Sequence, residues 1–388
     1  MIVAGIIAEY NPFHNGHKYQ IEQTRKGGAT HIVCVMSGTA VQRGDIAVYS
    51  KYERAKAAVK NGADLVLELP CPYSCSNGEV FARAAVSIMS GLGENVIDRI
   101  SFGCEENNLD LLSEAANISS AMKENYDVKK YVESGMSYPF AIEKAIEKNY
   151  GTIISSIFKQ PNNVLAIEYL KAINEFAPWI KPYAVNRKGA FHDSIKICDN
   201  IASATRIRDI IKNNETAKKL MPYYFDDTPA FIENSDKILL YKCVTAEKST
   251  LLNLPDVDEN IANRFRKACD SNPGSVSELI QKIKSKNITM ARIRRMILHL
   301  ILGIKKEDIK SVPYARILAF NQRGREILAK ANSPTIQLGT SLKELESKSD
   351  HSMRVSMLER NAVCLQDLSK EGAVNFTNEY THKIQIID

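Results

Sequence analysis

The sequence predicts an α/β protein in which a parallel sheet with helices on both faces is followed by a mainly helical, basic C-terminal domain. Over the first two hundred residues, short apolar runs alternate with amphipathic stretches, which is typical of repeated strand–helix units. From about residue 226, strand-like runs become rare and lysine-rich helical periodicity takes over. A chain of 388 residues is also long enough for two cores. We therefore expect one domain over residues 1–225 and a second over 226–388.

The strands and helices of the first domain are expected in alternation. The predicted strands span 2–8, 31–36, 63–69, 96–102 and 181–185. The predicted helices span 17–26, 51–61, 77–90, 109–124 and 162–176, and the polar stretch 125–160 is expected to form a helical insertion over the carboxyl edge of the sheet. In the second domain, apolar spacing predicts a helix over 290–302 that ends at Gly303, with Arg292, Arg295 and His299 on the face opposite its core.

Composition and charge narrow the class of protein. The chain is 44% hydrophobic and 25% charged, and no apolar run approaches the ~20 residues needed to span a bilayer. The eight cysteines are scattered, which favours reduced thiols and a cytoplasmic location. Of the net charge of +6, residues 281–330 carry thirteen Lys and Arg against three Asp and Glu. This segment indicates a polyanionic partner or, alternatively, a solvated face, and no protein partner is evident.

The strongest local signal is the run from Asn11 to His17, NPFHNGH, between the first predicted strand and the first helix. In an open parallel sheet, ligands bind where the strands end, and the N-terminus of the following helix attracts phosphate. Two imidazoles three residues apart can both donate hydrogen bonds to phosphate oxygens, and Gly16 lets the backbone approach a ligand closely. We therefore predict His14 and His17 as catalytic residues that act on ATP phosphates. The alternative is that one of them only caps the helix.

A second motif, SATRIR, opens the helix that follows the last predicted strand. Ser203 and Thr205 can bind backbone groups or phosphate in a first helical turn, and Arg206 and Arg208 bring two guanidinium groups toward the same anion. The alternative is a serine cap on a basic helix. The expected position beside the first motif favours the phosphate site.

Two further polar pairs lie close in sequence to the same edge of the predicted sheet. Gln42 and Arg43 follow the second strand and could orient a small carboxylate or the leaving pyrophosphate, or could lie in a flexible surface loop. Lys51 and Arg54 share one helical face and could reach phosphate, or could be solvated.

Two other groups raise catalytic and metal-binding alternatives. His192 beside Asp193 could serve as an acid or base, or could lie in a structural turn. Cys71 and Cys75, with Cys104 further on, have a spacing that invites a zinc interpretation, but no second close pair supports it. We expect no protein metal site.

The two motifs together resemble the nucleotidyltransferase superfamily, which is related to class I aminoacyl-tRNA synthetases. Longer blocks resemble the tRNA(Met) cytidine acetate ligase family and extend from the N-terminus to about residue 330. These blocks are AEYNPFHNGH, SGTAVQRGDIAVYSKYERAKAAVKNGADLVLELP, SFGCE, KQPNNVLAIEYLKA and PYARILAFNQRGREIL. The resemblance implies a Rossmann-like HxGH nucleotidyltransferase domain. It also implies a ligase that activates acetate with ATP as acetyladenylate, releases pyrophosphate, and transfers the acetyl group to N4 of the wobble cytidine (C34) of elongator tRNA(Met).

The resemblance also implies an ATP site. Its residues are Ile7, Ala8, Glu9, Tyr10, Asn11, Pro12, Phe13, His14, Asn15, Gly16, His17, Lys18, Tyr19, Gln20, Gly103, Asn162 and Arg187, to which the second motif adds Ser203, Thr205 and Arg208. Gly103 would let the adenosine pack closely, Asn162 would read the adenine or ribose, and Arg187 would pair with a phosphate. The motif departs from the superfamily pattern at Ala202 and Ala204, which removes one hydroxyl contact.

The second substrate would dock on the basic segment. The candidate tRNA contacts are Arg292, Arg295, Lys305, Lys306, Arg323 and Arg325. ATP is expected as a substrate accompanied by Mg²⁺, without a carboxylate cage in the protein. Two other functions remain open at this point. One is a small-molecule adenylyltransferase, and the other is an RNA-binding protein on an inactive nucleotidyltransferase scaffold.

Overall fold

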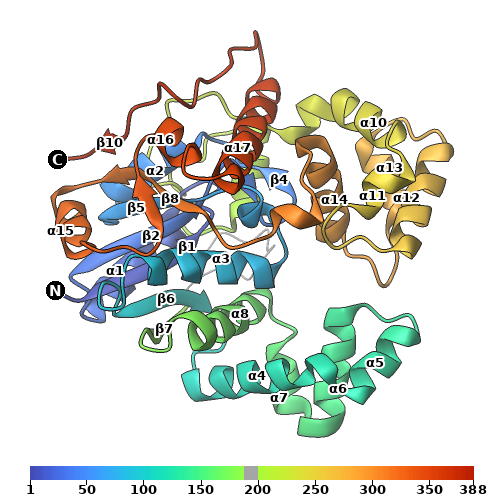
Figure 1. Ribbon diagram of the computed structural model, residues 1–388, viewed down its shortest axis with the longest axis horizontal. Coiled ribbons are helices and arrows are strands. Elements are labelled where there is room, and N and C mark those ends of the chain that lie inside the picture. The colour runs from blue at the N-terminus through green and yellow to red at the C-terminus, as the bar shows by residue number, and fades with distance from the viewer. Residues whose placement is uncertain (188–199) are drawn as a thin grey trace.

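A computed structural model describes residues 1–187 and 200–388, and its centre is a single large sheet (Figure 1). The strand order is β10-β8-β5-β2-β1-β6-β7, with β9 paired to β8. Five of these strands are parallel to one another: β1 Val3–Ala8, β2 His31–Ser37, β5 Leu65–Leu69, β6 Arg99–Cys104 and β7 Lys181–Asn186. They correspond to the five predicted strands, so the predicted α/β class is confirmed.

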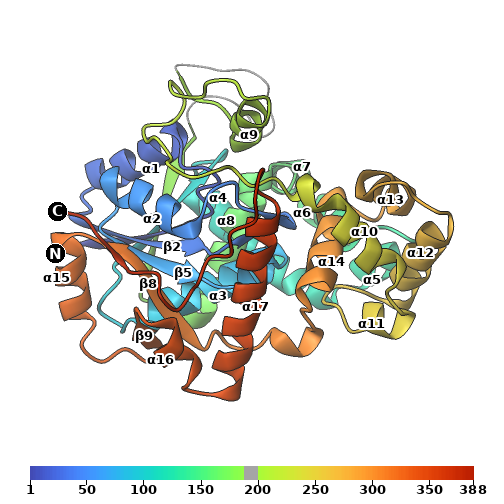
Figure 2. The ribbon, with the colours of Figure 1, turned by 90° about the horizontal axis from the view of Figure 1, so that it is seen from above.

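Helices cover both faces of this sheet because its strands are apolar on both sides. Val33 and Val35 of β2 belong to one buried cluster, whereas Ile32 and Cys34 belong to the other. The first cluster is covered by α3 Gly78–Gly91 and α8 Pro161–Phe176. The second is covered by α1 Asn15–Lys26 and α2 Lys51–Lys60. The helix α9 Ala204–Lys212 lies on the same side of the sheet as α1 and further from it (Figure 2).

The predicted insertion is helical and lies outside α8 (Figure 1). It consists of α5 Tyr126–Glu133, α6 Tyr138–Tyr150 and α7 Thr152–Ile157, and it follows the predicted helix over 109–124, which is α4 Leu109–Ala121 with η2 Met122–Glu124. Buried side chains of α4 and of the insertion, such as Leu112 and Ile146, join the same apolar cluster as Ile167 and Leu170 of α8. The insertion therefore extends the core on one side of the sheet.

A separate helical lobe, defined here as residues 236–302, has its own core and lies at one end of the sheet (Figures 1 and 2). Its helices are α10 Asp236–Val244, α11 Lys248–Leu252, α12 Glu259–Asp270, α13 Val276–Ile283 and α14 Met290–Leu302. The predicted helix over 290–302 is confirmed, and Gly303 ends it in the left-handed conformation with φ 76°.

The chain beyond this lobe returns to the sheet, which differs from the predicted division at residue 226. The strand β8 Tyr314–Phe320 pairs antiparallel with β5, and β9 Gln337–Gly339 and β10 Gln385–Ile386 pair with β8. The run YARILAF is short and largely buried, so its apolar pattern does not separate a strand from a helix segment. Between and after these strands lie α15 Gln322–Lys330, α16 Leu342–Glu346 and α17 Asp350–Leu368.

A buried ionic network holds this returning segment. Lys51 Nζ lies 2.6 Å from Glu68 Oε1, 3.1 Å from Glu359 Oε1 and 2.7 Å from Glu379 Oε2. Arg316 Nη1 lies 2.7 Å from the same Glu379 oxygen. The expectation that Lys51 reaches phosphate or solvent is wrong, because its side chain is only 1% exposed and is surrounded by carboxylates from β5, α17 and the C-terminal segment.

The pKa values of two carboxyl groups in this network are shifted in opposite directions. Burial acts to raise the pKa of Glu359, but Lys51 and the N–H groups of Cys71 and Thr39 outweigh it and hold the pKa at about 2. Burial dominates at Glu68 and raises its pKa to about 7 despite the nearby Lys51 charge. No helix within the two described ranges is both long and apolar enough to cross a membrane.

Replacing Lys51→Met should lower the free energy of unfolding by about 3–5 kcal/mol, because three carboxylates would remain buried without their shared cation. Urea denaturation followed by far-UV circular dichroism measures this. The matched control is Lys56→Met on the same helix, whose half-exposed pair with Glu53 spans 3.4 Å and should cost less than about 1 kcal/mol. Equal losses in the two variants would contradict the importance of the network.

Candidate active site

The β1–α1 loop places both predicted histidines at the N-terminus of α1. His14 is the N-cap residue, with extended backbone, and its Nδ1 accepts a hydrogen bond from the Gly16 N–H at 3.0 Å. His17 Nδ1 accepts a hydrogen bond from the His14 N–H at 3.3 Å. The two imidazoles therefore close a reciprocal capping arrangement usually built from Ser or Thr and Glu. Helix capping, which the sequence offered as an alternative, is present in both residues.

Capping leaves each ring with one free donor. Because each Nδ1 accepts an N–H, the ring proton of each imidazole must reside on Nε2. The two rings stack with centroids 3.7 Å apart and an interplanar angle of 26°. The loop thus presents two parallel imidazoles that both donate through Nε2. Their catalytic role stays a prediction, but capping and donation are compatible in the same side chain.

Both rings are held in the neutral form. Burial, together with the positive charges of Arg187 and Arg208, lowers the pKa of His14 to about 3. Burial also lowers the pKa of His17, with contributions from His14 and Arg187. Two stacked rings at this distance would repel each other if both were charged. At neutral pH the pair therefore donates hydrogen bonds without carrying charge.

Gly16 is required by the His14 ring. A Cβ at this position would lie 2.9 Å from His14 Cε1 and 3.0 Å from its Nδ1. A side chain here would displace the imidazole that the Gly16 N–H orients. This steric demand adds to the close ligand approach that the sequence predicts for Gly16.

Two buried aromatic rings pack against the His17 imidazole. Tyr10 packs edge-on against His17 with centroids 4.8 Å apart, and Phe13 lies 5.7 Å from the same ring. Tyr10 and Phe13 are almost fully buried and contact each other at 4.8 Å. Within the predicted ATP set, Tyr10 and Phe13 therefore pack against His17, whereas Ile7 is buried in the cluster on the other face of the sheet.

Other loop residues tie α1 to its neighbours. Asn15 Nδ2 donates to the carbonyl oxygens of Asn200 and Lys219, both at 2.8 Å. Asn11 Oδ1 accepts from the Val48 N–H at 2.8 Å, and Gln20 Nε2 donates to Ser101 O at 3.3 Å. The remaining predicted loop residues lie on the same segment. They are Ala8 at the end of β1, Glu9 and Pro12 in the loop, and Lys18 and Tyr19 in the second turn of α1.

The second motif lies against this loop, as predicted. Arg208 Nη1 donates to Asn11 O at 2.9 Å, and Arg208 Nη2 donates to Thr205 Oγ1 at 3.2 Å. Ser203 caps α9 by accepting the Arg206 N–H at 3.2 Å. The structure thus brings Arg208 beside the histidine pair, consistent with its effect on the pKa of His14.

A third group of predicted residues meets where β6 and β7 end. Arg187 Nη1 donates to Asn162 Oδ1 at 3.2 Å, and the stem of Arg187 passes over Gly103, where a Cβ would lie 3.4 Å from Cγ. Asn162 also donates to the carboxylate of Glu105. The sequence did not single out Glu105, which follows β6 directly and also accepts the Asn163 N–H at 3.0 Å. The sequence could have indicated Glu105 through its position two residues after Gly103, at the end of a predicted strand.

Two of the weaker candidates have structural roles at this edge. Arg54 is fully buried and donates to Glu9 O at 2.7 Å and to Ser37 O at 3.0 Å, so it ties strand ends together and does not reach phosphate. Gln42 lies in a small hairpin, β3 Ala40–Val41 and β4 Asp45–Ile46, and its N–H donates to Glu9 Oε1 at 2.8 Å. The pair His192 and Asp193 lies outside the described residues.

The cysteines form no metal site in the part of the chain that the structure describes. Cys71 Sγ and Cys75 Sγ lie 3.7 Å apart and fully buried, while Cys104 lies in β6 and donates weakly to Val185 O. No group of three His, Cys, Asp or Glu among the described residues could hold a metal ion. His299 is also buried, with Nε2 2.9 Å from Cys75 O, so its expected place beside Arg292 on an open face is wrong.

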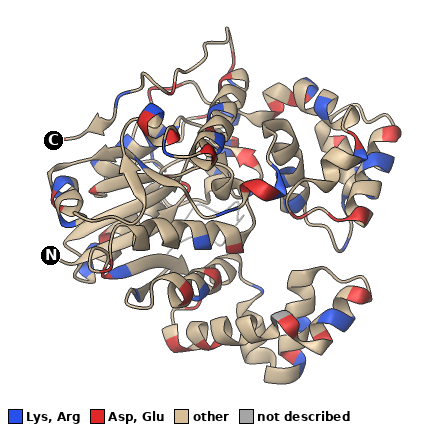
Figure 3. Ribbon diagram, in the orientation of Figure 1, with Lys and Arg blue, Asp and Glu red and all other residues tan. Residues whose placement is uncertain are grey.

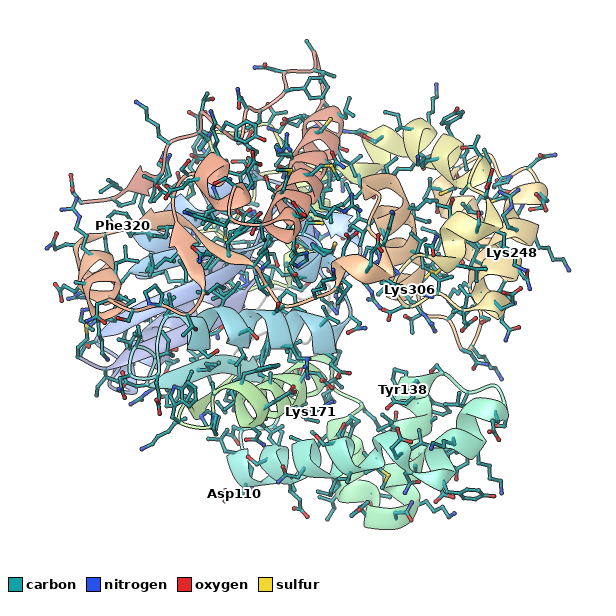
Figure 4. The ribbon with its side chains drawn as sticks, viewed as in Figure 1. Asp110, Tyr138, Lys171, Lys248, Lys306 and Phe320 are labelled. Atoms are coloured by element: carbon teal, nitrogen blue, oxygen red, sulfur yellow. The ribbon has the colours of Figure 1, made fainter. Side chains whose placement is uncertain are left out.

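The six predicted tRNA contacts do not form one surface. Arg292, Arg295, Lys305 and Lys306 lie on α14 and directly after it, and Lys306 marks the rim of the helical lobe in Figure 4. Arg323 and Arg325 lie on α15, which follows β8 beyond Phe320, at the opposite end of the molecule (Figure 4). Because β8 runs antiparallel to β5, its carboxyl end reaches the edge of the sheet away from the His14 loop. High charge density along the sequence therefore does not mark a single face.

Comparison with known proteins agrees with this geometry. The model of the HIGH Nucleotidyl Transferase family matches residues 1–375. The chain belongs to this family. A tRNA(Met) cytidine acetate ligase of Clostridium tetani is 36% identical over 84% of this chain and 87% of that protein. The ligase of the same name from Caldanaerobacter subterraneus subsp. tengcongensis is 37% identical over 91% of this chain and 92% of that protein.

The fold is also similar to that of a protein of known structure over its full length. Crystal structures of Thermotoga maritima TmcAL, one apo and one bound with alpha-thio ATP, each superpose with a TM-score of 0.89. They cover 100% of both chains at 24% identity, which supports the fold. The resemblance stated from the sequence blocks, to the tRNA(Met) cytidine acetate ligases within the nucleotidyltransferases, is thereby confirmed.

The capping arrangement separates the two functions of His14 experimentally. Replacing His14→Asn keeps a side-chain acceptor for the Gly16 N–H, since Asn is a favoured N-cap, but removes the Nε2–H donor. We expect the free energy of unfolding to stay within about 1 kcal/mol of wild type. The kcat of acetate-dependent ATP–pyrophosphate exchange should fall on the order of 10²–10³-fold. Near-normal exchange in a folded variant would show that the ring only caps the helix.

Proposed function

We propose that this chain is an ATP-dependent tRNA(Met) cytidine acetate ligase, which forms acetyladenylate from ATP and acetate and acetylates N4 of the wobble cytidine C34 of elongator tRNA(Met). The observation that carries the proposal is the pair of neutral, stacked imidazoles with Nε2–H donors at the N-terminus of α1. The positive charges of Arg187 and Arg208 act on this pair. The names of the relatives supply the substrates.

In the first half-reaction, an acetate oxygen attacks the α-phosphorus of ATP and pyrophosphate leaves. Negative charge grows on the α-phosphoryl oxygens and on the departing group. His14 and His17 donate to this charge, and the N-terminus of α1 adds the favourable end of its helix dipole. Arg187 and Arg208 hold the outer phosphates. Little covalent chemistry falls to the protein, so positioning and electrostatics account for the rate.

ATP enters this site as its magnesium complex. Mg²⁺ commonly binds through substrate phosphates, waters and one or two carboxylates. Glu9 of the predicted ATP set and Glu105 beside it already accept hydrogen bonds from Gln42 and from Asn162. This donor set fits an ion that arrives with the nucleotide.

In the second half-reaction, N4 of cytidine attacks the carbonyl carbon of the mixed anhydride and AMP leaves. The cytidine comes from a tRNA whose phosphates dock on the helical lobe and on the turn that follows it, and the contacts are Arg292, Arg295, Lys305 and Lys306. Figure 3 shows Lys and Arg positions along the helices of this lobe, interspersed with Asp and Glu positions. A small-molecule adenylyltransferase has no use for such a lobe, and an inactive scaffold has no need of two oriented imidazole donors.

One assay separates these functions. The protein is incubated with ATP, labelled acetate and bulk tRNA, and AMP, pyrophosphate and N4-acetylcytidine are measured. We expect label in tRNA only when ATP is present, with one AMP and one pyrophosphate released per acetyl group. Labelling without ATP, or ATP turnover with no label in tRNA, would contradict the proposed function.

The docking surface has its own test. Replacing Arg292→Ala together with Lys305→Ala should weaken tRNA(Met) binding and reduce the slope of log Kd against log salt by about 1.5–2, because two phosphate contacts are lost. Filter binding between 50 and 200 mM salt measures both. The matched control replaces Arg323→Ala and Arg325→Ala on α15 and should leave affinity and slope unchanged. A larger loss in the α15 variant would move the docking surface to the other end of the molecule.

A further inference from the structure

On one side, the β3–β4 hairpin contacts the β1–α1 loop, residues 9–14, which we call the nucleotide loop. The Gln42 N–H at its turn donates to Glu9 Oε1 at 2.8 Å, and the Val48 N–H just after β4 donates to Asn11 Oδ1 at 2.8 Å. Asn11 O in turn accepts from Arg208. The hairpin is therefore fixed at the edge of the sheet where the predicted ATP residues lie.

The other side of the hairpin lies on the helical lobe. Gly44, with φ 75°, packs so closely on α14 that a Cβ would collide with the backbone of Arg294 and Arg295. Asp45 follows directly and begins β4. It thus stands between the nucleotide loop and the first turns of the helix that carries part of the proposed tRNA surface.

The Asp45 carboxylate has few partners for a group in this position. Its side chain accepts the Ile46 N–H at 2.8 Å. Within residues 1–187 and 200–388, no Lys, Arg or His nitrogen lies in ion-pair distance of it. The charged groups that act on it are Arg208 of α9 and Arg294 of α14, which favour the anion, and Glu233 of η3 Ile232–Ser235, which opposes it.

Other elements packed around the hairpin bring further groups. From α17, the neutral Gln366 amide donates to Ala47 O just after β4, and the ionised Glu359 accepts the Thr39 N–H just before β3. Burial, partly offset by Arg208 and by the Ile46 N–H, raises the pKa of Asp45 to about 6. A partly buried carboxylate with a raised pKa, and with no ion-pair partner among the described residues, is suited to act as a general base near neutral pH.

The histidine pair does not serve as this base. Each Nδ1 already accepts a backbone N–H, and each Nε2 carries the proton, so neither ring offers a free lone pair. Glu105 is held by Asn162 and Asn163 at the far end of the site. Asp45 directly follows Gly44, which packs on α14, and so lies toward the lobe from which the tRNA is proposed to approach.

We propose that Asp45 is the general base of acetyl transfer, a role that rests on the proposed function. The lone pair of cytidine N4 forms the new C–N bond to the acetyl carbonyl carbon. The bond from that carbon to the adenylate oxygen breaks, and AMP leaves with the electron pair. The proton that N4 loses passes to an Asp45 carboxylate oxygen. The exocyclic amine is a weak nucleophile because its lone pair is delocalised into the ring, so removing the proton drives the step forward.

The two half-reactions are measured separately to test this role. Single-turnover transfer from preformed acetyl-AMP to tRNA(Met) reports the second half, and acetate-dependent ATP–pyrophosphate exchange reports the first. For Asp45→Asn, the ratio of transfer rate to exchange rate should fall on the order of 10²–10³-fold. Asp45→Glu should recover part of it. In a plot of transfer rate against pH, the wild-type rate should rise to a plateau with an apparent pKa near 6. For Asp45→Asn, the rate should not show this rise.

A matched control is Glu233→Gln, which removes a nearby exposed carboxylate that pairs with Lys212 at 3.0 Å. It should transfer at the wild-type rate. Transfer by Asp45→Asn at the wild-type rate would overturn the role of Asp45 and leave the proposed function standing. An equal loss of both half-reactions in Asp45→Asn and Asp45→Glu would do the same. A wild-type protein that exchanges pyrophosphate with no acetate dependence would overturn the proposed function itself.

Discussion

The buried ion network around Lys51 is the interaction on which the rest of the structure depends. It joins α2 and β5 of the first half of the chain to α17 and the C-terminal segment, across 308 residues between Lys51 and Glu359. Such a network stabilises only when every charge is paired, and here Glu359 also accepts the N–H groups of Thr39 and Cys71 where β2 and β5 end. The carboxyl edge of the sheet is therefore fixed by the C-terminal return of the chain.

This edge then determines the nucleotide loop. Arg54, one turn after Lys51, donates hydrogen bonds to the backbone carbonyls of Glu9 and Ser37. These bonds fix the end of β1, where the loop begins. The loop itself is closed by the two histidines, which satisfy helix N–H groups with Nδ1 and keep Nε2 for a ligand. The helix cap and the proposed phosphate site therefore share the same two side chains, through different ring nitrogens. Stability and the proposed chemistry are coupled here for that reason.

Local patterns in the sequence predicted much of this arrangement. The five parallel strands are short apolar runs followed by helical periodicity, and the HxGH loop occurs at the junction where a parallel sheet binds ligands. The second motif could be placed beside it because consecutive strand–helix units in one sheet lie on a common edge. Gly103, Asn162 and Arg187 came from a family resemblance, and the structure brings these three together.

Features that depend on distant pairing could not be predicted in the same way. The mostly apolar run of β8 stands apart from the alternating strand–helix units and could equally belong to a buried helix segment. Its antiparallel direction moves Arg323 and Arg325 away from Arg292. Lys51 looks solvated in sequence because its carboxylate partners lie on other elements, Glu359 more than three hundred residues away. Asp45 carries no sequence signal beyond a polar turn. Its position follows from the contact of Gly44 with α14.

The most direct measurement of the central claim follows an oxygen atom. Acetate labelled with ¹⁸O in both carboxylate positions is supplied with ATP and tRNA(Met), and the products are analysed by mass spectrometry. If acetate attacks the α-phosphorus and the acetyl group then passes to cytidine, each AMP should carry one ¹⁸O and the pyrophosphate none. Unlabelled AMP, or ¹⁸O in inorganic phosphate or pyrophosphate, would contradict activation through acetyladenylate.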